Sequence, residues 1–410
     1  MPATRSPRST RGRRAGLVVG LLALGATAAC GTTGSDTPAN GISTTTSTLL
    51  APWQGTFTTS SLPAPVQTLR AVACASASRC FAVGSTAATA TVPSGPVVMA
   101  TTNGGRTWTL QSLPPGLGYL SGIACATARA CTAVGQAGGT GVGPGAVVTT
   151  TDGGSTWTSQ AVPTGTTDVT AVDCRPRGSC TALGTVDGHV ATLAPAGAGG
   201  AWAVGGPLPP AASSATSLSC TDDEDCWATT SNAVDSAHAV GGIASTSDGG
   251  AAWAFETVPV GTGQLNAVTC SRASAASTST STTTTGTAAS CTAVGTTSTV
   301  INGTRVGQGI VLTSANGGVT WGSAPVSPTA ADLLDVSCGA GPCVAVGSSV
   351  ATAVQAGVVV LTPATGASAG IWRRAVTAPE ALPLTGVSCV SLASCVVVGE
   401  SVSARLTSSA

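Results

Sequence analysis

Residues 120–157 read LSGIACATARACTAVGQAGGTGVGPGAVVTTTDGGSTW, and this stretch contains both motifs that decide the fold. The first motif is a pair of cysteines, Cys125 and Cys131, with five residues between them. The second is a Gly-Gly turn that ends at Trp157. Around the two motifs, short apolar runs alternate with Gly, Pro, Ser and Thr, a pattern typical of short antiparallel strands.

Both motifs recur in phase at a period of about 50 residues, which is the signature of a repeat architecture. The first cysteines of the pairs are Cys74, Cys125, Cys174, Cys220, Cys270, Cys338 and Cys389. The tryptophans in phase with them are Trp53, Trp108, Trp157, Trp202, Trp253, Trp321 and Trp372. A length of 410 residues alone would suggest two or three domains of ~150 residues, but the repeat overrides that expectation.

Each unit is expected to form four strands, which in the second unit are 120–125, 131–135, 146–150 and 156–162. Seven units predict an all-β fold, a seven-bladed β-propeller of four-stranded antiparallel blades. The alternative, a linear β-solenoid, would need a cap at each end. The strand at 53–62 precedes every cysteine pair, and the last pair has no Trp strand after it. The N-terminal strand is therefore predicted to complete the seventh blade and close the ring.

One disulfide per blade is predicted, because a short antiparallel hairpin brings its strand ends within disulfide reach. Metal binding would favour CxxC spacing or histidine ligands, and the two histidines, His189 and His238, lie away from the pairs. We therefore expect no metal site. The predicted pairs are Cys74–Cys80, Cys125–Cys131, Cys174–Cys180, Cys220–Cys226, Cys270–Cys291, Cys338–Cys343 and Cys389–Cys395. The seven pairs use 14 of the 15 cysteines, and the one left unpaired is Cys30.

Residues 1–29 are predicted to be a signal peptide, with an arginine-rich start and an apolar segment too short to span a bilayer. Residues 27–31, TAACG, resemble a bacterial lipobox, which implies lipidation of Cys30 and a membrane anchor on the extracytoplasmic side. Ordinary cleavage and secretion is the alternative, and the Sec and twin-arginine routes both stay open. Residues 30–50 then form a linker. The propeller spans 51–410, with a Ser/Thr-rich loop insertion at 273–289.

Four copies of the second motif, TTNGGRTW, TTDGGSTW, TSDGGAAW and SANGGVTW, resemble the Asp-box, or BNR, repeat of the sialidase-like superfamily of propellers. The resemblance implies a structural role, in which an Asp or Asn caps a turn and the Trp packs between blades. The residues concerned are Asn103, Trp108, Asp152, Trp157, Asp248, Trp253, Asn316 and Trp321. In the family this box lies on the face away from the ligand.

Strands that run up and down place the cysteine turns and the Gly-Gly turns on one face. The loops between second and third strands, and the connections between blades, then form the opposite, ligand-binding face. Loops on a rigid scaffold often carry binding residues. The candidates on that face are Tyr119, Asp187, His189, Asp235, His238 and Arg305, together with Asn232, Asn302 and Asp332.

No catalytic residue is predicted. A sialidase would use three arginines, a Tyr–Glu pair and an Asp, whereas this chain has one tyrosine, Tyr119, and four glutamates. The acidic run Asp222–Asp225 lacks the alternating ligands of a calcium loop and is predicted to be a solvated charge cluster. No cofactor is expected. The chain after Cys30 carries 11 arginines and 16 acidic residues, a net charge of −5, which argues against nucleic acid.

These observations favour a lipid-anchored cell-surface propeller that acts as a non-catalytic binding or assembly scaffold for a protein or a glycan. The alternative is an exo-acting carbohydrate-active enzyme, a glycoside hydrolase or lyase of the sialidase-like type. A carboxylate pair ~5–9 Å apart on the ligand face would favour that alternative. A structural role in the envelope, without a discrete ligand, is a third interpretation.

Overall fold

The computed structural model describes residues 55–408 apart from short gaps. The gaps are 90–92, 139–142, 177–178, 198–199, 236–237, 273–287, 298, 302–303, 325, 327–329, 340–342, 350–355, 362–371, 378–382 and 392. The predicted signal peptide, lipidation of Cys30, linker and Trp53 lie outside the described residues, as do Asn302 and nearly all of the Ser/Thr-rich insertion.

Thirty β-strands make up the regular structure of the described residues. Six four-stranded antiparallel sheets, called blades 1 to 6, follow one another along the chain. Blade 1 contains β2 (Val66–Cys74), β3 (Cys80–Thr86), β4 (Pro96–Thr101) and β5 (Thr109–Leu110). Blade 2 contains β6 (Leu117–Cys125), β7 (Cys131–Ala137), β8 (Gly145–Thr150) and β9 (Thr158–Gln160). Blade 3 contains β10 (Thr166–Cys174), β11 (Cys180–Val186), β12 (His189–Pro195) and β13 (Trp202–Pro207).

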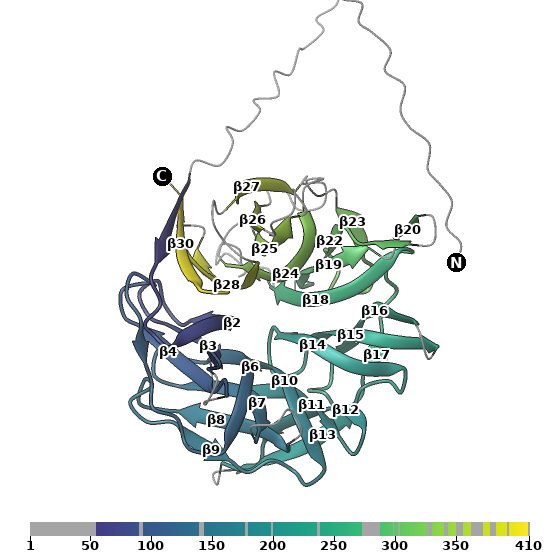
Figure 1. Cartoon of the computed structure of the whole chain (residues 1–410). Helices are drawn as coiled ribbons and strands as arrows, with labels where there is room; N and C mark the ends of the chain where they lie inside the picture. Colours follow the sequence, from purple (N-terminus) through teal and green to yellow (C-terminus); the bar gives the residue numbers. More distant parts are fainter. Residues whose placement is uncertain are drawn as a thin grey trace, which may run out of the picture. The chain divides into compact units, whose positions relative to one another are not determined.

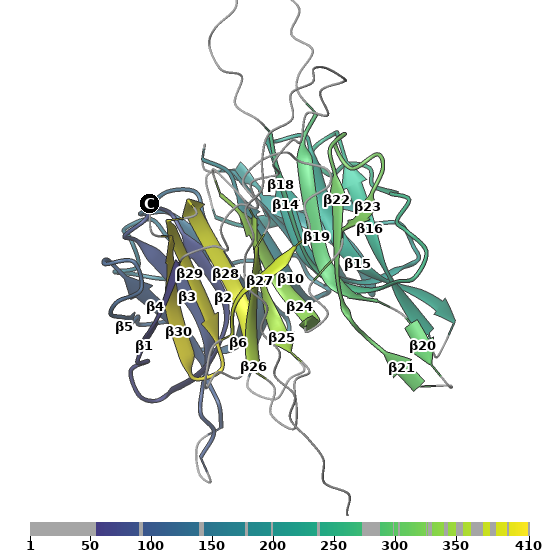
Figure 2. The same ribbon diagram turned by 90° about the horizontal axis from the view of Figure 1, so that it is seen from above.

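Blades 4 to 6 follow the same plan, with one addition. Blade 4 contains β14 (Ala212–Cys220), β15 (Cys226–Asp235), β16 (His238–Thr246) and β17 (Ala254–Phe255). Blade 5 contains β18 (Thr262–Ser271), β19 (Ser290–Thr297), β22 (Gly309–Ser314) and β23 (Gly322–Ala324). A two-stranded ribbon, β20 (Thr299–Ile301) and β21 (Thr304–Val306), is inserted between β19 and β22 and projects away from the sheets (Figure 2). Blade 6 contains β24 (Ala330–Cys338), β25 (Cys343–Ser349), β26 (Ala356–Leu361) and β27 (Arg373–Thr377).

The expected count of seven blades is corrected to six self-contained blades and one composite sheet. This closing sheet contains β28 (Leu384–Ser391), β29 (Ser394–Gly399) and β30 (Val402–Ser408), and its fourth strand, β1 (Gly55–Ser60), comes from the other end of the described chain. β1 pairs with β30 from Gly55↔Ser408 to Ser60↔Ser403, and the two strands lie side by side in Figure 2. The physical reason is that the first described strand, β1, is the outermost strand of the closing sheet, whereas the other three strands of that sheet come at the C-terminal end.

The first strand of each sheet lies innermost, and these strands contact one another in a closed order. β2 contacts β6, the order continues through β10, β14, β18 and β24 to β28, and β28 contacts β2. Figure 1 shows the seven strands around a common centre. The architecture is therefore an all-β propeller, as the repeat predicts. Pairing of β1 with β30 protects an edge of the closing sheet that would otherwise be free to pair with another chain.

The core lies between neighbouring sheets. One cluster joins Phe81 and Val98 of blade 1 to Leu120 and Trp157 of blade 2. The Phe81 and Trp157 rings meet edge to face at 6.1 Å, which is a favourable aromatic geometry. Trp108 of blade 1 packs on the closing sheet in the same way, and its indole N–H donates to the Ser403 hydroxyl at 2.9 Å. The recurrent tryptophans therefore fill the junctions between sheets.

Two kinds of turn form one face of the propeller, here called the disulfide face. The turns between first and second strands carry the disulfides, and all seven predicted pairs are bonded, with Cα atoms 4.0–4.1 Å apart. The turns between third and fourth strands carry the Gly-Gly motif. The opposite face holds the second-to-third loops and the connections between sheets, and is here called the connection face.

The four Gly-Gly turns share one hydrogen-bond pattern. In blade 2, the Asp152 carboxylate accepts the Thr156 N–H at 3.0 Å, and the Thr150 hydroxyl accepts the Gly154 N–H at 2.9 Å. The bonds that Asp152 accepts from the Thr156 hydroxyl, the Thr156 N–H and the Thr150 hydroxyl lower its pKa to about 2. Asn103, Asp248 and Asn316 accept the equivalent backbone N–H at 2.9–3.1 Å. An ionised carboxylate occupied by its own turn acts as a cap.

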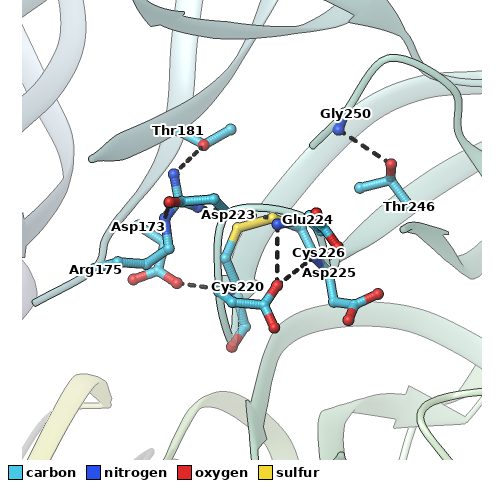
Figure 3. The surroundings of a disulfide bond; sticks show 12 residues. Asp173, Arg175, Thr181, Cys220, Asp223, Glu224, Asp225, Cys226, Thr246 and Gly250 are labelled. Carbon is cyan, nitrogen blue, oxygen red and sulfur yellow. Dashed lines mark hydrogen bonds and ion pairs between the residues drawn. A yellow bond between two sulfur atoms is a disulfide. The ribbon is translucent and has the colours of Figure 1, made fainter. Parts of the chain in front are cut away.

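The acidic run at 222–225 is partly exposed to solvent, as predicted, and is also paired with arginines of the two neighbouring blades. Arg175 of blade 3 contacts Asp223 at 2.8 Å and is itself buried (Figure 3). From blade 5, Arg272 contacts Asp222 at 2.7 Å and also pairs with Asp225. Figure 3 shows the run wrapped around the Cys220–Cys226 disulfide. The acidic turn therefore links the turns of three neighbouring blades.

Candidate functional site

The innermost strands enclose a central channel with a cavity volume of about 440 Å³. Each of these strands is the edge of its sheet, so its outer backbone groups face the channel instead of another strand. Buried backbone donors and acceptors need partners. Side chains and solvent in the channel must supply these partners. The channel wall is therefore polar, because it contains backbone N–H and C=O groups of every innermost strand.

A β-bulge four residues before the first cysteine shapes every innermost strand. In β2, Leu69 pairs with Gly84 and Ala71 with Val83, so Arg70 is the extra residue, and the other six strands show the same shift. A bulge redirects the side chain of its extra residue. All seven of these residues line the channel: Arg70, Ser121, Thr170, Thr216, Asn266, Leu334 and Thr385.

Four bulge side chains bind the backbone of the next innermost strand. Their donors reach the carbonyl oxygen of the residue just before the next bulge, at 2.6–3.0 Å. The donor–acceptor pairs are Ser121 to Val169, Thr216 to Leu265, Asn266 to Leu333, and Thr385 to Leu69. These bonds hold neighbouring sheets in register around the channel.

A second set of bonds lies nearer the disulfide face, where a side chain accepts the N–H of the first cysteine in the next sheet. The pairs are Cys74 with Ser388, Cys220 with Asp173, Cys270 with Ser219, and Cys389 with Ser337, at 2.7–3.0 Å. The residue two positions before that cysteine, toward the connection face, is bound in the same way. Ser217 accepts the Val268 N–H, and Asp335 accepts the Val387 N–H. Most of these acceptors are hydroxyls, but Asp173 and Asp335 are carboxyls.

Burial changes the acidity of both carboxyls. It raises the pKa of Asp335 to about 7, although the Val387 and Val336 N–H groups bind its oxygens at 2.7 and 2.8 Å and oppose that shift. Burial also raises the pKa of Asp173, against the opposing bonds from Cys220 and Cys174 and the charge of Arg175. Desolvation therefore outweighs hydrogen bonding at both positions.

Toward the connection face, Tyr119 of β6 donates its phenol to Asp168 of β10 at 3.0 Å. Burial and the bond to Asp168 raise the pKa of Tyr119 to about 12. Burial raises the pKa of Asp168 too, against the opposing bond from Tyr119. The Asn266 amide donates to Asp332 at 3.0 Å, and burial likewise raises the pKa of Asp332.

The predicted ligand-face residues do not form one cluster. Tyr119 lies in a strand and not in a loop, because β6 starts at Leu117, three residues before the predicted strand. Asp187 and Gly188 form the two-residue turn between β11 and β12, both with positive φ, and the neighbouring His189 is exposed. Asp332 lies in β24.

The other candidates lie in blades 4 and 5. In β15, Asn232 accepts the Thr230 hydroxyl at 2.7 Å. Asp235 and His238 pair at the end of the β15–β16 hairpin, and Arg305 belongs to β21. The side chains of these last three residues lie outside the described part of the structure.

Sequence reasoning missed four polar residues that line the channel, Arg70, Asn266, Asp173 and Asp335, and also Asp168, the partner of Tyr119. The available signal was positional. Arg70 and Asn266 stand four residues before the first cysteine of their unit, Asp168 and Asp332 six, and Asp335 three. Aligning the seven copies on that cysteine would have placed them together.

Two further findings concern the described residues only. No group of three His, Cys, Asp or Glu side chains in that part of the chain is arranged to hold a metal ion. Nor does the same part contain a helix long and apolar enough to cross a membrane.

Comparison with known proteins supports the fold. No family model and no curated protein sequence matches the chain. Among solved structures, YCF48 bound to D1 peptide aligns over 87% of this chain and 96% of its own, at 14% identity and a TM-score of 0.55. A catalytically inactive virginiamycin B lyase from Staphylococcus aureus, with quinupristin, covers 86% of this chain and 99% of its own, at 10% identity and a TM-score of 0.57.

A GH74 xyloglucanase from Xanthomonas campestris aligns over 81% of this chain but only 50% of its own, at 13% identity and a TM-score of 0.51. Identities this low show a shared propeller fold and nothing finer. One fold hosts many functions, so the role of this chain has to be argued from its own residues.

Proposed function

We propose that the protein is an exported, non-catalytic propeller that binds a protein partner on its connection face, held at the cell surface by a lipid on Cys30. The seven disulfides support an extracytoplasmic location, because such bonds persist in oxidising compartments. The anchor rests on the lipobox resemblance.

The observation that carries the non-catalytic role is the state of Tyr119, the one tyrosine of the chain. A tyrosine nucleophile needs its phenolate form to be favoured. Here the phenol donates to Asp168, and the pKa of Tyr119 is raised to about 12, which disfavours the phenolate. The residue ties β6 to β10, which is a structural task.

A protein is favoured over a glycan because glycan sites usually offer an exposed aromatic ring. Trp108, Trp157, Trp202, Trp321 and Trp372 are buried between sheets. The exposed ring of Phe255 lies in β17, the outer strand of blade 4, and not in a connection. The connection face instead offers exposed backbone turns, which begin at proline in several connections. Pro63, Pro163, Pro209 and Pro259 each accept the N–H three residues later, at 2.8–3.3 Å. Rigid turns of this kind suit contact with another protein, since little entropy is lost on binding.

The test is photo-crosslinking in native envelopes, with a crosslinking amino acid at one exposed position per face. Val260 stands in the connection between blades 4 and 5 and is fully exposed, whereas Val319, 64% exposed, stands in a Gly-Gly turn of the disulfide face. We expect the same partner to be captured repeatedly from position 260 and not from position 319. Capture from position 319 alone, or equal capture from both, would contradict the proposal.

The carbohydrate-active alternative has one observation in its favour, the raised pKa of Asp168 and Asp332, since a glycosidase acid needs such a shift. The test is hydrolysis of a panel of polysaccharides by the wild-type protein. Activity that is present in the wild type and lost in both Asp168→Asn and Asp332→Asn would establish that alternative. The binding role predicts no such activity.

A further inference from the structure

The junctions between blades 1 and 2 and between blades 2 and 3 both lack polar side chains at the two acceptor positions, which in blade 2 are Gly122 and Ala124. Blade 1 differs from blade 2 at its bulge, where Arg70 replaces Ser121, which binds the Val169 carbonyl. At other junctions a polar side chain of one innermost strand binds the backbone of the next, as Ser219 does for Cys270 and Ser388 for Cys74. In blade 1 the two acceptor positions are occupied by Ala71 and Ala73. Neither alanine has a side-chain acceptor to offer to blade 2.

The backbone donors that face these alanines are identified by equivalence. In blade 5, the N–H groups of Val268 and Cys270 point toward the channel side of β18, where Ser217 and Ser219 accept them. Ile123 and Cys125 hold the same positions in β6. Both residues line the channel cavity, together with Ala71 and Ala73. Their N–H groups therefore require an acceptor from the cavity itself, because an unmet donor is costly.

Arg70 supplies a positive charge to the same cavity. It is the bulge residue of blade 1, and its counterparts Ser121 and Thr385 bond to the next strand. Within the described residues, the Arg70 guanidinium makes no hydrogen bond or ion pair, and the residue is exposed. Its charge acts on Tyr119 through space, where it favours the phenolate and so opposes the raised pKa. A free guanidinium offers several N–H donors in a planar fork that matches an oxyanion.

We propose that the channel binds a carboxylate at the junction of blades 1 and 2, with Arg70 as its ion-pair partner and the N–H groups of Ile123 and Cys125 as hydrogen-bond donors. A carboxylate is preferred over phosphate because the single charge of Arg70 matches a singly charged anion, whereas the second charge of phosphate would have no ion-pair partner among the described residues that line the channel. The inference rests on the proposed function in one respect, that an acidic group of the partner is the natural occupant.

The probes are acetate and inorganic phosphate, added to the purified chain while amide shifts and the melting temperature are recorded. Acetate is expected to shift the Ile123 and Cys125 amide signals and to raise the melting temperature. Phosphate is expected to bind at least tenfold more weakly than acetate. Equal binding of both anions would overturn the assignment to a carboxylate, and absence of acetate binding would overturn the site.

Two variants and one control locate the site. Arg70→Gln removes the charge, and Ala73→Ser installs in blade 1 the hydroxyl that Ser219, Ser337 and Ser388 provide elsewhere. Each is expected to weaken acetate binding tenfold or more, the second by occupying the Cys125 N–H. Arg106→Gln removes the same charge from a Gly-Gly turn on the disulfide face and is expected to bind as the wild type does. Unchanged binding in both Arg70→Gln and Ala73→Ser would overturn the proposal.

The two proposals fail separately. Acetate binding without any partner crosslinked at position 260 would leave the carboxylate site and remove the protein-binding role. Partner capture at position 260 without acetate binding would leave the binding role and remove the carboxylate site. An acidic peptide from the captured partner then distinguishes a partner side chain from a free small acid, because only the former binds more tightly than acetate.

Discussion

Ionisation of the Asp335 carboxyl lowers the stability of the folded chain. Its pKa rises from the ordinary value of 3.8 to about 7 in the folded chain because burial disfavours the charged form. Between these two values the folded protein retains a proton that the unfolded chain has lost. The stability contributed by this group is therefore complete below about pH 4 and is lost as the pH rises through about 7.

The variant Asp335→Asn tests this reasoning, since an amide of the same shape does not titrate. We expect the free energy of unfolding of the wild type to fall between pH 5 and pH 8 by more than that of Asp335→Asn, measured by denaturant titration at each pH. Parallel pH profiles for the two proteins would show that the Asp335 pKa is not raised.

At the scale of single residues, the sequence predicted the roles of the cysteines and the Gly-Gly turns. It did not predict the roles of the residues between these motifs. The cysteines and the Gly-Gly turns are visible because their chemistry is local to a turn. Asp335 acquires its character from Val387, which lies in a neighbouring strand more than 40 residues away in the chain. Arg70 stands at a bulge that forms against β3 and is not visible in the sequence of one unit.

Among the elements, the acidic turn of blade 4 offers a contrast between two arginines. Arg175 is buried and binds Asp223, Ser179 and Thr181, whereas Arg272 is 43% exposed and pairs with Asp222 and Asp225. Loss of a buried charged partner leaves polar groups unsatisfied, while an exposed pair contributes little.

Arg175→Ala is therefore expected to destabilise the fold by about 2–3 kcal/mol, and Arg272→Ala by less than about 1 kcal/mol. Thermal and denaturant unfolding of both variants under identical conditions provides the measurement. A cost for Arg272→Ala equal to or above that for Arg175→Ala would contradict the burial argument.

The strands themselves were largely predictable, because apolar runs between turn residues set them. Where the prediction differs, packing is the cause. The fourth strand of blade 2 was expected at 156–162 but pairs only at Thr158–Gln160, since the Thr156 N–H is taken by Asp152 and Trp157 turns into the core. The β20–β21 ribbon had no recognisable turn signal.

For the whole molecule, the decisive contact is the pairing of β1 with β30. Thr56 and Thr407 face each other in that pair, and their hydroxyls are 2.7 Å apart. In a Cys30→Ala background, Thr56→Cys with Thr407→Cys is expected to form a disulfide on oxidation and to raise the melting temperature, because a long loop is closed. Non-reducing peptide mapping detects the bond. Failure to form it would show that the two ends do not pair.

At this scale the repeat predicted a closed propeller, while the predicted count of seven blades was wrong. Six blades are continuous in the chain, and the closing sheet combines β28, β29 and β30 with β1. The phase of the Trp strand relative to the first cysteine pair carried that information. Function was less accessible, because a channel wall is assembled from all seven innermost strands and has no signature within one unit.

The two faces of the propeller are expected to have different tasks, with the disulfide face holding the fold and the connection face binding the partner. Amide hydrogen exchange of the full chain, alone and with the captured partner bound, tests this division most directly. We predict slower exchange in the connections around Thr166, Ala212 and Thr262 and no change in the Gly-Gly turns. Slower exchange confined to the Gly-Gly and disulfide turns would contradict it.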